Sequence, residues 1–138
     1  MQTTLTLETF LSLLLAVALG AAVGIEREFT HKPAGLRTHM LVSLGACLFT
    51  IVSMGFSVDP ARIASGIVAG IGFIGAGTIW AEKDKVQGIT TAASLWATAA
   101  IGLTAGIGDY PLAAVVTLLV VIILASNRLL KRIGLEKD

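Results

Sequence analysis

The sequence is poor in charged residues. Only 14% of its 138 residues are charged, whereas 55% are hydrophobic and the mean hydropathy is +0.87. An ordinary soluble domain carries roughly 25% charged residues. Because a chain this short has a large surface for its volume, so few polar side chains nearly exclude a soluble monomer.

Cysteine and an excess of either charge are also lacking. The single cysteine, Cys47, cannot form a disulfide within the chain and lies in an apolar stretch, as a small core residue would. Ten Lys and Arg against nine Asp and Glu give a net charge of +1. No basic field therefore indicates nucleic-acid binding, and no acidic tail indicates a solvating arm.

Spacings typical of metal, catalytic and cofactor sites are absent from the sequence. The two histidines, His31 and His39, are separated by a proline and a glycine, which is not a metal-ligand spacing. No Ser, His and Asp set can be assigned, and the lone cysteine has no evident base. The sequence therefore predicts neither an enzyme nor a cofactor.

One glycine pattern imitates a dinucleotide-binding motif. Gly70, Gly72 and Gly75 read G-x-G-x-x-G, but they lie inside an apolar segment. The strand before the motif and the acidic residue about 20 positions later are both missing. Helix packing explains these glycines better.

Five apolar segments fill most of the chain: residues 9–25, 39–56, 63–80, 89–107 and 112–130. A helix of about 20 residues crosses a ~30 Å hydrocarbon core. We therefore predict an all-α integral membrane bundle of five transmembrane helices, forming one domain over residues 1–138. No separate catalytic domain fits in the remaining residues.

The basic residues are distributed unequally between the predicted loops. Nine of the ten lie between the first and second segments, between the third and fourth, or after the fifth: Arg27, Lys32, Arg37, Lys83, Lys85, Arg128, Lys131, Arg132 and Lys137. Arg62 stands alone on the other side, close to Asp59. The positive-inside rule then predicts a cytoplasmic C-terminus and an outward N-terminus.

Small residues indicate where the predicted helices approach one another closely. The helix-packing glycines are Gly20 and Gly24 in the first segment, Gly66, Gly70, Gly72, Gly75 and Gly77 in the third, and Gly102 in the fourth. The third segment has small residues on two faces, so we expect it to lie between neighbours. Glycine or alanine ladders left exposed would join a homo-oligomer, with a dimer favoured.

Charged residues beside the first two segments are candidate functional groups. Glu26 and Arg27 follow the first segment, and Arg37 and His39 open the second. Consecutive helical residues point about 100° apart, so we expect at most one of Glu26 and Arg27 to face the bundle. Either both extend to the membrane interface, or Glu26 pairs with Arg37 and fixes a cytoplasmic mouth or partner surface.

Polar residues elsewhere have two interpretations each. Arg62 either anchors a helix start beside Asp59 or lines a pathway. Thr90 and Thr91 either cap the fourth helix after Gly88 or are functional polar groups, as Thr98 is. We expect one stripe of the fourth helix to turn inward: Thr91, Ser94, Thr98, Gly102 and Ala105. Of the two tryptophans, we expect Trp80 at the membrane interface and Trp96 packed within the bundle.

Five stretches together resemble the MgtC/SapB family of membrane proteins. They are GIERE at 24–28, AGLRTHMLVSLG at 34–45, RIA at 62–64, GIGFIGAG at 70–77 and GITTAASLWATAAIG at 88–102. The resemblance covers nearly the whole chain in order. Its family-like charged positions are Glu26, Arg27, Arg37 and Arg62.

The resemblance implies a multi-pass protein of the bacterial inner membrane. Members are associated with growth at low magnesium, virulence and survival in host cells, and the founding member is understood to restrain the F-type ATP synthase. Virulence-associated members have Asn where this chain has Thr90 and Cys where it has Ala97. Larger members continue into a soluble cytoplasmic domain, whereas this chain stops eight residues after Leu130, as a short form would.

Two functions remain open from the sequence. The first is a non-enzymatic protein that binds a membrane partner in a magnesium or ionic-stress response. The second is a small oligomeric transporter or channel, with a polar pathway lined by the fourth helix and by charges at the helix ends. The lipid bilayer is the environment that both share.

Overall fold

Five helices and one two-stranded hairpin build the described part of the protein. The computed structural model describes residues 6–56, 59–83 and 85–132. The helices are α1 (Leu7–Phe29), α2 (Leu36–Met54), α3 (Pro60–Ala76), α4 (Ile89–Gly106) and α5 (Tyr110–Arg132), and the strands are β1 (Trp80–Glu82) and β2 (Lys85–Gln87). The prediction of a single domain over residues 1–138 extends beyond the described residues and stays a prediction.

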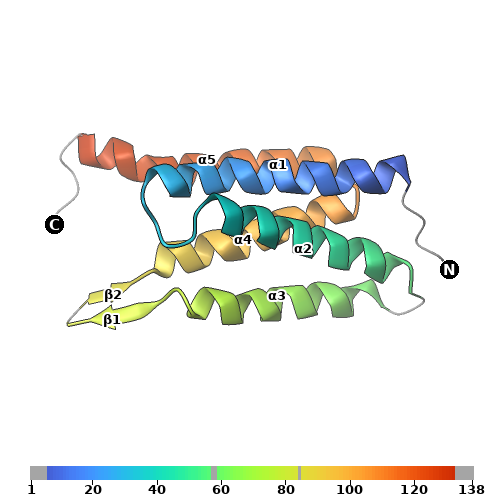
Figure 1. Ribbon diagram of the computed structural model, residues 1–138, viewed down its shortest axis with the longest axis horizontal. Coiled ribbons are helices and arrows are strands. Elements are labelled where there is room, and N and C mark those ends of the chain that lie inside the picture. Colours follow the sequence, from blue (N-terminus) through green and yellow to red (C-terminus); the bar gives the residue numbers. More distant parts are fainter. Residues whose placement is uncertain (1–5, 57–58, 84, 133–138) are drawn as a thin grey trace.

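The helices lie side by side and alternate in direction (Figure 1). The end of α1, the start of α2, the hairpin and the end of α5 gather at one end of the bundle, here called the hairpin end. The start of α1, the start of α3 and the α4–α5 turn lie at the opposite end, here called the far end. Because the number of helices is odd, the start of α1 and the end of α5 lie at opposite ends of the bundle.

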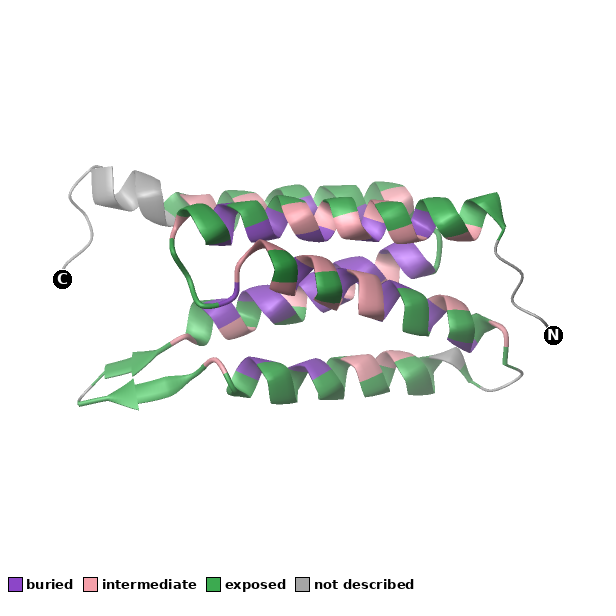
Figure 2. Cartoon of the chain, in the orientation of Figure 1, coloured by how far each residue is buried: buried purple, intermediate pink, exposed green. Residues whose placement is uncertain are grey.

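Helix α4 is the central element. It packs against α1, α2, α3 and α5, and its buried residues include Leu95 and Ile101. Figure 2 shows this burial along α4, whereas α3 at the edge of the bundle is mostly exposed. The polar stripe predicted to turn inward is buried in full: Thr91, Ser94, Thr98, Gly102 and Ala105.

Local signals set most helix ends. The Thr6 side chain caps α1 by accepting a hydrogen bond from the Thr9 amide, and Asp59 caps α3 in the same way just before Pro60. Gly88 precedes α4 with a φ of +87°, and any side chain there would collide with the Thr78 carbonyl. Glycine is the residue that tolerates this conformation, so Gly88 lets the chain turn from the hairpin into α4.

Close helix contacts occur at three of the glycines predicted to pack helices together. A β-carbon at Gly20 would lie 2.6 Å from the His39 carbonyl oxygen, and one at Gly24 would lie 2.7 Å from the Leu36 α-carbon. A β-carbon at Gly102 would collide with the Ser43 carbonyl. Both α1 and α4 therefore touch the backbone of α2 directly, as small residues in membrane helices permit.

The expectation that the third helix lies between neighbours is wrong for a single chain. Helix α3 contacts α4 and, less extensively, α2. Gly75 approaches Ala92, and Gly77 caps the helix. Nothing lies within 4 Å of the positions where β-carbons would stand on three other glycines: Gly66, Gly70 and Gly72. Small residues permit close approach, but they do not require that a helix of the same chain makes it.

The segment predicted as a helix over residues 63–80 is wrong at its end. Helix α3 stops at Ala76, and Trp80 begins the hairpin, in which Trp80 pairs with Gln87 and Glu82 with Lys85. Trp96, expected in the bundle, is 53% exposed on the outer face of α4. A helix that is central still has one face that no neighbour covers.

Three helices in the described part of the chain are long and apolar enough to cross a membrane, namely α1, α2 and α4. Helices α3 and α5 contain shorter apolar stretches, Ala61–Ala76 and Tyr110–Ser126. The prediction of an all-helical bundle with membrane-spanning helices is therefore confirmed, and the number of five transmembrane helices stays a prediction.

Candidate functional site: a buried polar cluster

Polar side chains from three helices come together toward the hairpin end. They come from the end of α1, the first part of α2 and the first half of α4, and all are buried: Glu26, Arg27, His39, Ser43, Thr91, Ser94 and Thr98. We call this set the polar cluster. Most of its members were candidates from the sequence, and the fold brings them together from three separate segments.

Glu26 and Arg27 are both buried, at 7% and 4% exposure. The expectation that at most one would face the bundle is wrong, because α1 packs against α2, α4 and α5 and is covered on more than one side. Extension of both side chains to the membrane interface is excluded for the same reason.

The two charges form an ion pair. The Nε of Arg27 lies 3.5 Å from a carboxylate oxygen of Glu26. The Arg27 guanidinium also donates to the hydroxyl of Thr30 at 3.5 Å. Arg37, the alternative partner for Glu26, is exposed in the first turn of α2. A buried pair of this kind stabilises each charge through the other, and removal of one partner is costly.

His39 connects α2 to α4. Its side chain is completely buried, with Nδ1 at 2.9 Å from the Gly35 carbonyl oxygen and Nε2 at 3.1 Å from the Ser94 Oγ. Because a carbonyl only accepts, Nδ1 carries a proton. The Ser94 hydroxyl also lies 2.8 Å from the Thr91 carbonyl oxygen. When the imidazole is neutral, Nε2 carries no proton and only accepts. The single proton of the Ser94 hydroxyl then has two possible acceptors, Nε2 of His39 and the Thr91 carbonyl oxygen.

The threonines of α4 differ in their roles. Thr98 is buried and donates to the Ser94 carbonyl at 2.8 Å. Thr90 is exposed and lies outside the polar cluster. The interpretation of Thr90 and Thr91 as capping residues is wrong, because Gly88 occupies the capping position and no side chain makes a capping hydrogen bond there.

Ser43 was not singled out as a functional candidate, although it begins a weak polar stripe in the sequence. It is buried, and its hydroxyl has no hydrogen-bond partner among the described residues. Its backbone carbonyl lies against Gly102 and its β-carbon lies near Gly20. Ser43 thus stands where α1, α2 and α4 meet most closely.

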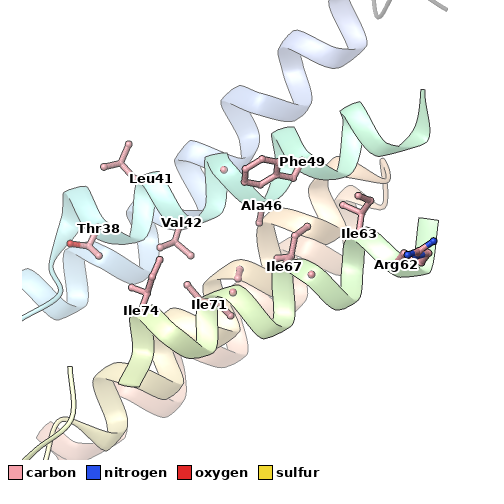
Figure 3. Close-up of a pocket in the computed structure, with 14 residues that line it drawn as sticks. Thr38, Leu41, Val42, Ala46, Phe49, Arg62, Ile63, Ile67, Ile71 and Ile74 are labelled. Carbon is pink, nitrogen blue, oxygen red and sulfur yellow. The ribbon is translucent and has the colours of Figure 1, made fainter. Parts of the chain in front are cut away.

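Arg62 lies apart from the polar cluster, at the far end of the bundle. It lines an apolar groove of about 710 Å³ between α2 and α3 (Figure 3). The predicted pairing with Asp59 is not found among the described residues, where the Asp59 carboxylate accepts from the Ala61 amide at 2.9 Å. Arg62 and the polar cluster therefore belong to different sites.

The arrangement is better suited to holding helices than to chemistry on a substrate. In the part of the chain that the structure describes, no three His, Cys, Asp or Glu residues come together to hold a metal ion. The hydroxyls of Ser94 and Thr98 are occupied by backbone carbonyls. The polar cluster ties α1, α2 and α4 together at one end.

Comparison with known proteins agrees with this all-helical membrane architecture. The model of the MgtC family matches residues 13–133. This chain belongs to the MgtC family. The match includes every residue of the polar cluster, together with Arg62 and the glycines of α3.

Several relatives are similar to this chain over most of its length. "Putative magnesium transporter YhiD" of Escherichia coli (strain K12) is 46% identical over 129 residues, covering 84% of this chain and 60% of the relative. "Protein MgtC" of Salmonella typhimurium (strain LT2) is 48% identical over 122 residues, covering 88% and 52%. "Protein MgtC" of Brucella abortus (strain 2308) is 48% identical over 118 residues, covering 84% and 48%.

The chain thus spans about half to three fifths of the length of these relatives. No solved structure is significantly similar to it.

Proposed function

We propose that this protein is a non-enzymatic component of the magnesium response of a bacterial inner membrane, and that it acts by binding a membrane partner. The name of the Escherichia coli relative, "Putative magnesium transporter YhiD", supports the connection to magnesium. The observation that carries binding over transport is the direct packing of α4 on α2, where Gly102 lies against the Ser43 carbonyl. This contact leaves no room for a solute between the two most polar helix faces.

We also propose that all five helices cross the membrane, with the N-terminus outside. The alternating helices in Figure 1 support this topology, and so does the location of Arg27, Lys32, Arg37, Lys83 and Lys85 around the hairpin end. The side chains of Arg128, Lys131, Arg132 and Lys137 lie outside the described residues. The short apolar stretch of α3 is accommodated by local thinning of the bilayer.

Cysteine labelling tests this topology. In a Cys47→Ala background, Lys83→Cys reports on the hairpin and Asp109→Cys on the α4–α5 turn. A membrane-impermeant maleimide added to intact spheroplasts is expected to label the second variant alone. Labelling of the first variant before the membrane is opened contradicts the proposed orientation.

The proposal includes two partners, and each is one component of it. One is a second copy of the chain, because α3 carries an exposed row of small residues on the side away from α2: Ser65, Ala69, Gly72 and Ala76. The other is a membrane complex, for which the family resemblance points to the F-type ATP synthase. Crosslinking in native membranes is expected to give a dimer, and recovery of monomer alone contradicts the first component.

A deletion strain tests the function as a whole. Loss of the gene is expected to impair growth at low magnesium, and affinity purification from crosslinked membranes is expected to recover ATP synthase subunits. Complementation by Glu26→Gln is expected to fail and complementation by Arg37→Gln to succeed, because only the first change disturbs the polar cluster. Normal growth of the deletion strain, together with no recovered partner, overturns the proposal.

Transport is the second candidate function. The name of the Escherichia coli relative favours it, as does the inward stripe of Thr91, Ser94 and Thr98. A route would then form between subunits, since α2 and α4 are in contact within one chain. Magnesium flux into proteoliposomes that is abolished by Thr98→Val or Arg62→Ala supports transport, and silent proteoliposomes count against it.

A further inference from the structure

An open recess, here called the α2–α3 groove, lies between α2 and α3. It encloses about 710 Å³. Figure 3 shows its walls, with Val42 and Ala46 on α2 pointing toward Ile67 and Ile71 on α3. Leu41 and Phe49 also line the groove. Almost every side chain that lines it is apolar, so the groove is suited to a hydrocarbon ligand.

Glycines keep the groove open. Gly45, Gly66 and Gly70 line it, and nothing lies within 4 Å of the position of a β-carbon on any of them. The α3 wall runs from Ile63 to Ile74, which at 1.5 Å per residue is about 16 Å. One leaflet of a membrane contributes about half of a ~30 Å hydrocarbon core. The groove is therefore as long as one leaflet is thick.

The far end of the groove carries a cation. Arg62 lies in the first turn of α3, just beyond Ile63, and it lines the groove. Its ion-pairing candidate, Asp59, uses its carboxylate to cap α3. Among the described residues, no carboxylate is recorded within salt-bridge distance of the Arg62 guanidinium. An apolar slot as long as one leaflet thus ends at an available guanidinium at the level of the headgroups.

We propose that the α2–α3 groove binds one phospholipid, with an acyl chain between α2 and α3 and the phosphate held by Arg62. A phospholipid places an anion at one end of a hydrocarbon chain, which matches the groove and its cation in one molecule. Arginine also binds phosphate through two parallel hydrogen bonds. A second copy of α3 would fill the slot, but the helix itself contains no carboxylate for Arg62. This inference rests on the membrane location of the chain and not on its proposed partner.

Native mass spectrometry of the purified protein tests the proposal. The protein is released from detergent in the presence of phosphatidylglycerol or phosphatidylethanolamine, and we expect one phospholipid to persist after loosely attached lipids are stripped. Gly70→Leu fills the groove and is expected to abolish this adduct. The matched control is Gly72→Leu, because Gly72 lies on the same helix, is equally open and points away from the groove. It is expected to keep the adduct even if it weakens the proposed contact between two copies, because the groove lies within one chain.

Changes at Arg62 test the headgroup contact separately. Arg62→Ala is expected to weaken retention about tenfold, as loss of a charge-assisted hydrogen bond would, whereas Arg62→Lys is expected to keep most of it. Added inorganic phosphate is expected not to displace the lipid, because phosphate alone gains nothing from the apolar walls. Equal retention by the wild type, Gly70→Leu and Arg62→Ala overturns the proposal.

Photocrosslinking in native membranes identifies the occupant without relying on a groove-filling variant. Phe49, which lines the groove, is replaced by benzoylphenylalanine and irradiated. A mass increase equal to one phospholipid supports the proposal. A crosslinked dimer at this position, or a Gly70→Leu variant that becomes monomeric while Gly72→Leu stays dimeric, means that a second copy occupies the groove and overturns it.

Discussion

The Nε2 of His39 lies 3.1 Å from the Oγ of Ser94, across 55 positions of sequence. This contact joins the first part of α2 to α4, the helix at the centre of the bundle. The other ring nitrogen contacts the Gly35 carbonyl oxygen, so the completely buried imidazole has a partner on both sides. His39 is therefore held in one orientation, and it holds α4 against α2 in turn.

Loss of the His39–Ser94 contact is expected to destabilise the protein. His39→Ala and Ser94→Ala should each lower the free energy of unfolding by about 1–3 kcal/mol. Ser94→Ala leaves Nε2 of the buried imidazole without its partner, and His39→Ala removes a completely buried side chain. The double variant should be little worse than His39→Ala alone, since one contact is lost only once. Unfolding in detergent measures both effects. Thr90→Ala, at an exposed position of the same helix, is the control, and strictly additive losses contradict a direct coupling.

The close approach of α4 to α2 predicts opposite effects for two identical substitutions. Gly102→Ala brings a methyl group into the Ser43 carbonyl and is expected to cost about 1–3 kcal/mol, because the two backbones must separate. Gly45→Ala points into open space and is expected to be neutral or to stabilise α2 by up to about 1 kcal/mol. Thermal unfolding of the two variants gives the comparison. A Gly102→Ala variant as stable as Gly45→Ala contradicts the packing described here.

The inward faces of the helices could be predicted from the sequence, but their neighbours could not. The polar stripe of α4 and the small-residue ladder that includes Gly20 and Gly24 are buried as predicted, because periodicity identifies a face. The number of helices that pack around α1 is a tertiary property, and the burial of both Glu26 and Arg27 depends on it. For the same reason, the open glycines of α3 could not be distinguished from Gly102 by residue type.

The hairpin was missed because its signals are short. Strands β1 and β2 have three residues each, and every one of these residues is exposed, so no alternating pattern of burial marks them. Ile79 and Trp80 extend the apolar character of α3 past Ala76, and they lengthened the predicted helix. The groove beside Arg62 could not be predicted either, since it depends on how far α3 diverges from α2.

The buried charges predict a strong response to neutralisation of either partner. Glu26→Gln or Arg27→Gln is expected to lower the free energy of unfolding by about 3–5 kcal/mol, because a charge stays buried without its counter-ion. The double variant, which buries no net charge, is expected to be more stable than either single variant. Arg37→Gln is the matched control at an exposed position, and it should change stability by less than about 0.5 kcal/mol. Single variants as stable as this control contradict the burial of the pair.

The two tryptophans predict different depths in the membrane. Trp96 is 53% exposed on α4 and lies seven residues after Ile89, about 10 Å into the helix, so we expect it to face lipid tails. Trp80 is 46% exposed in the hairpin and lies outside the helices. Trp80→Phe and Trp96→Phe each leave a single tryptophan, so the fluorescence of Trp96 and that of Trp80 can be measured separately in liposomes. Lipids brominated deep in the acyl chain should quench Trp96 strongly and Trp80 weakly, whereas aqueous iodide should show the reverse order. If the deep bromine atoms quench Trp80 and Trp96 equally, the hairpin enters the bilayer, which contradicts the prediction. If they do not quench Trp96, another chain covers the outer face of α4.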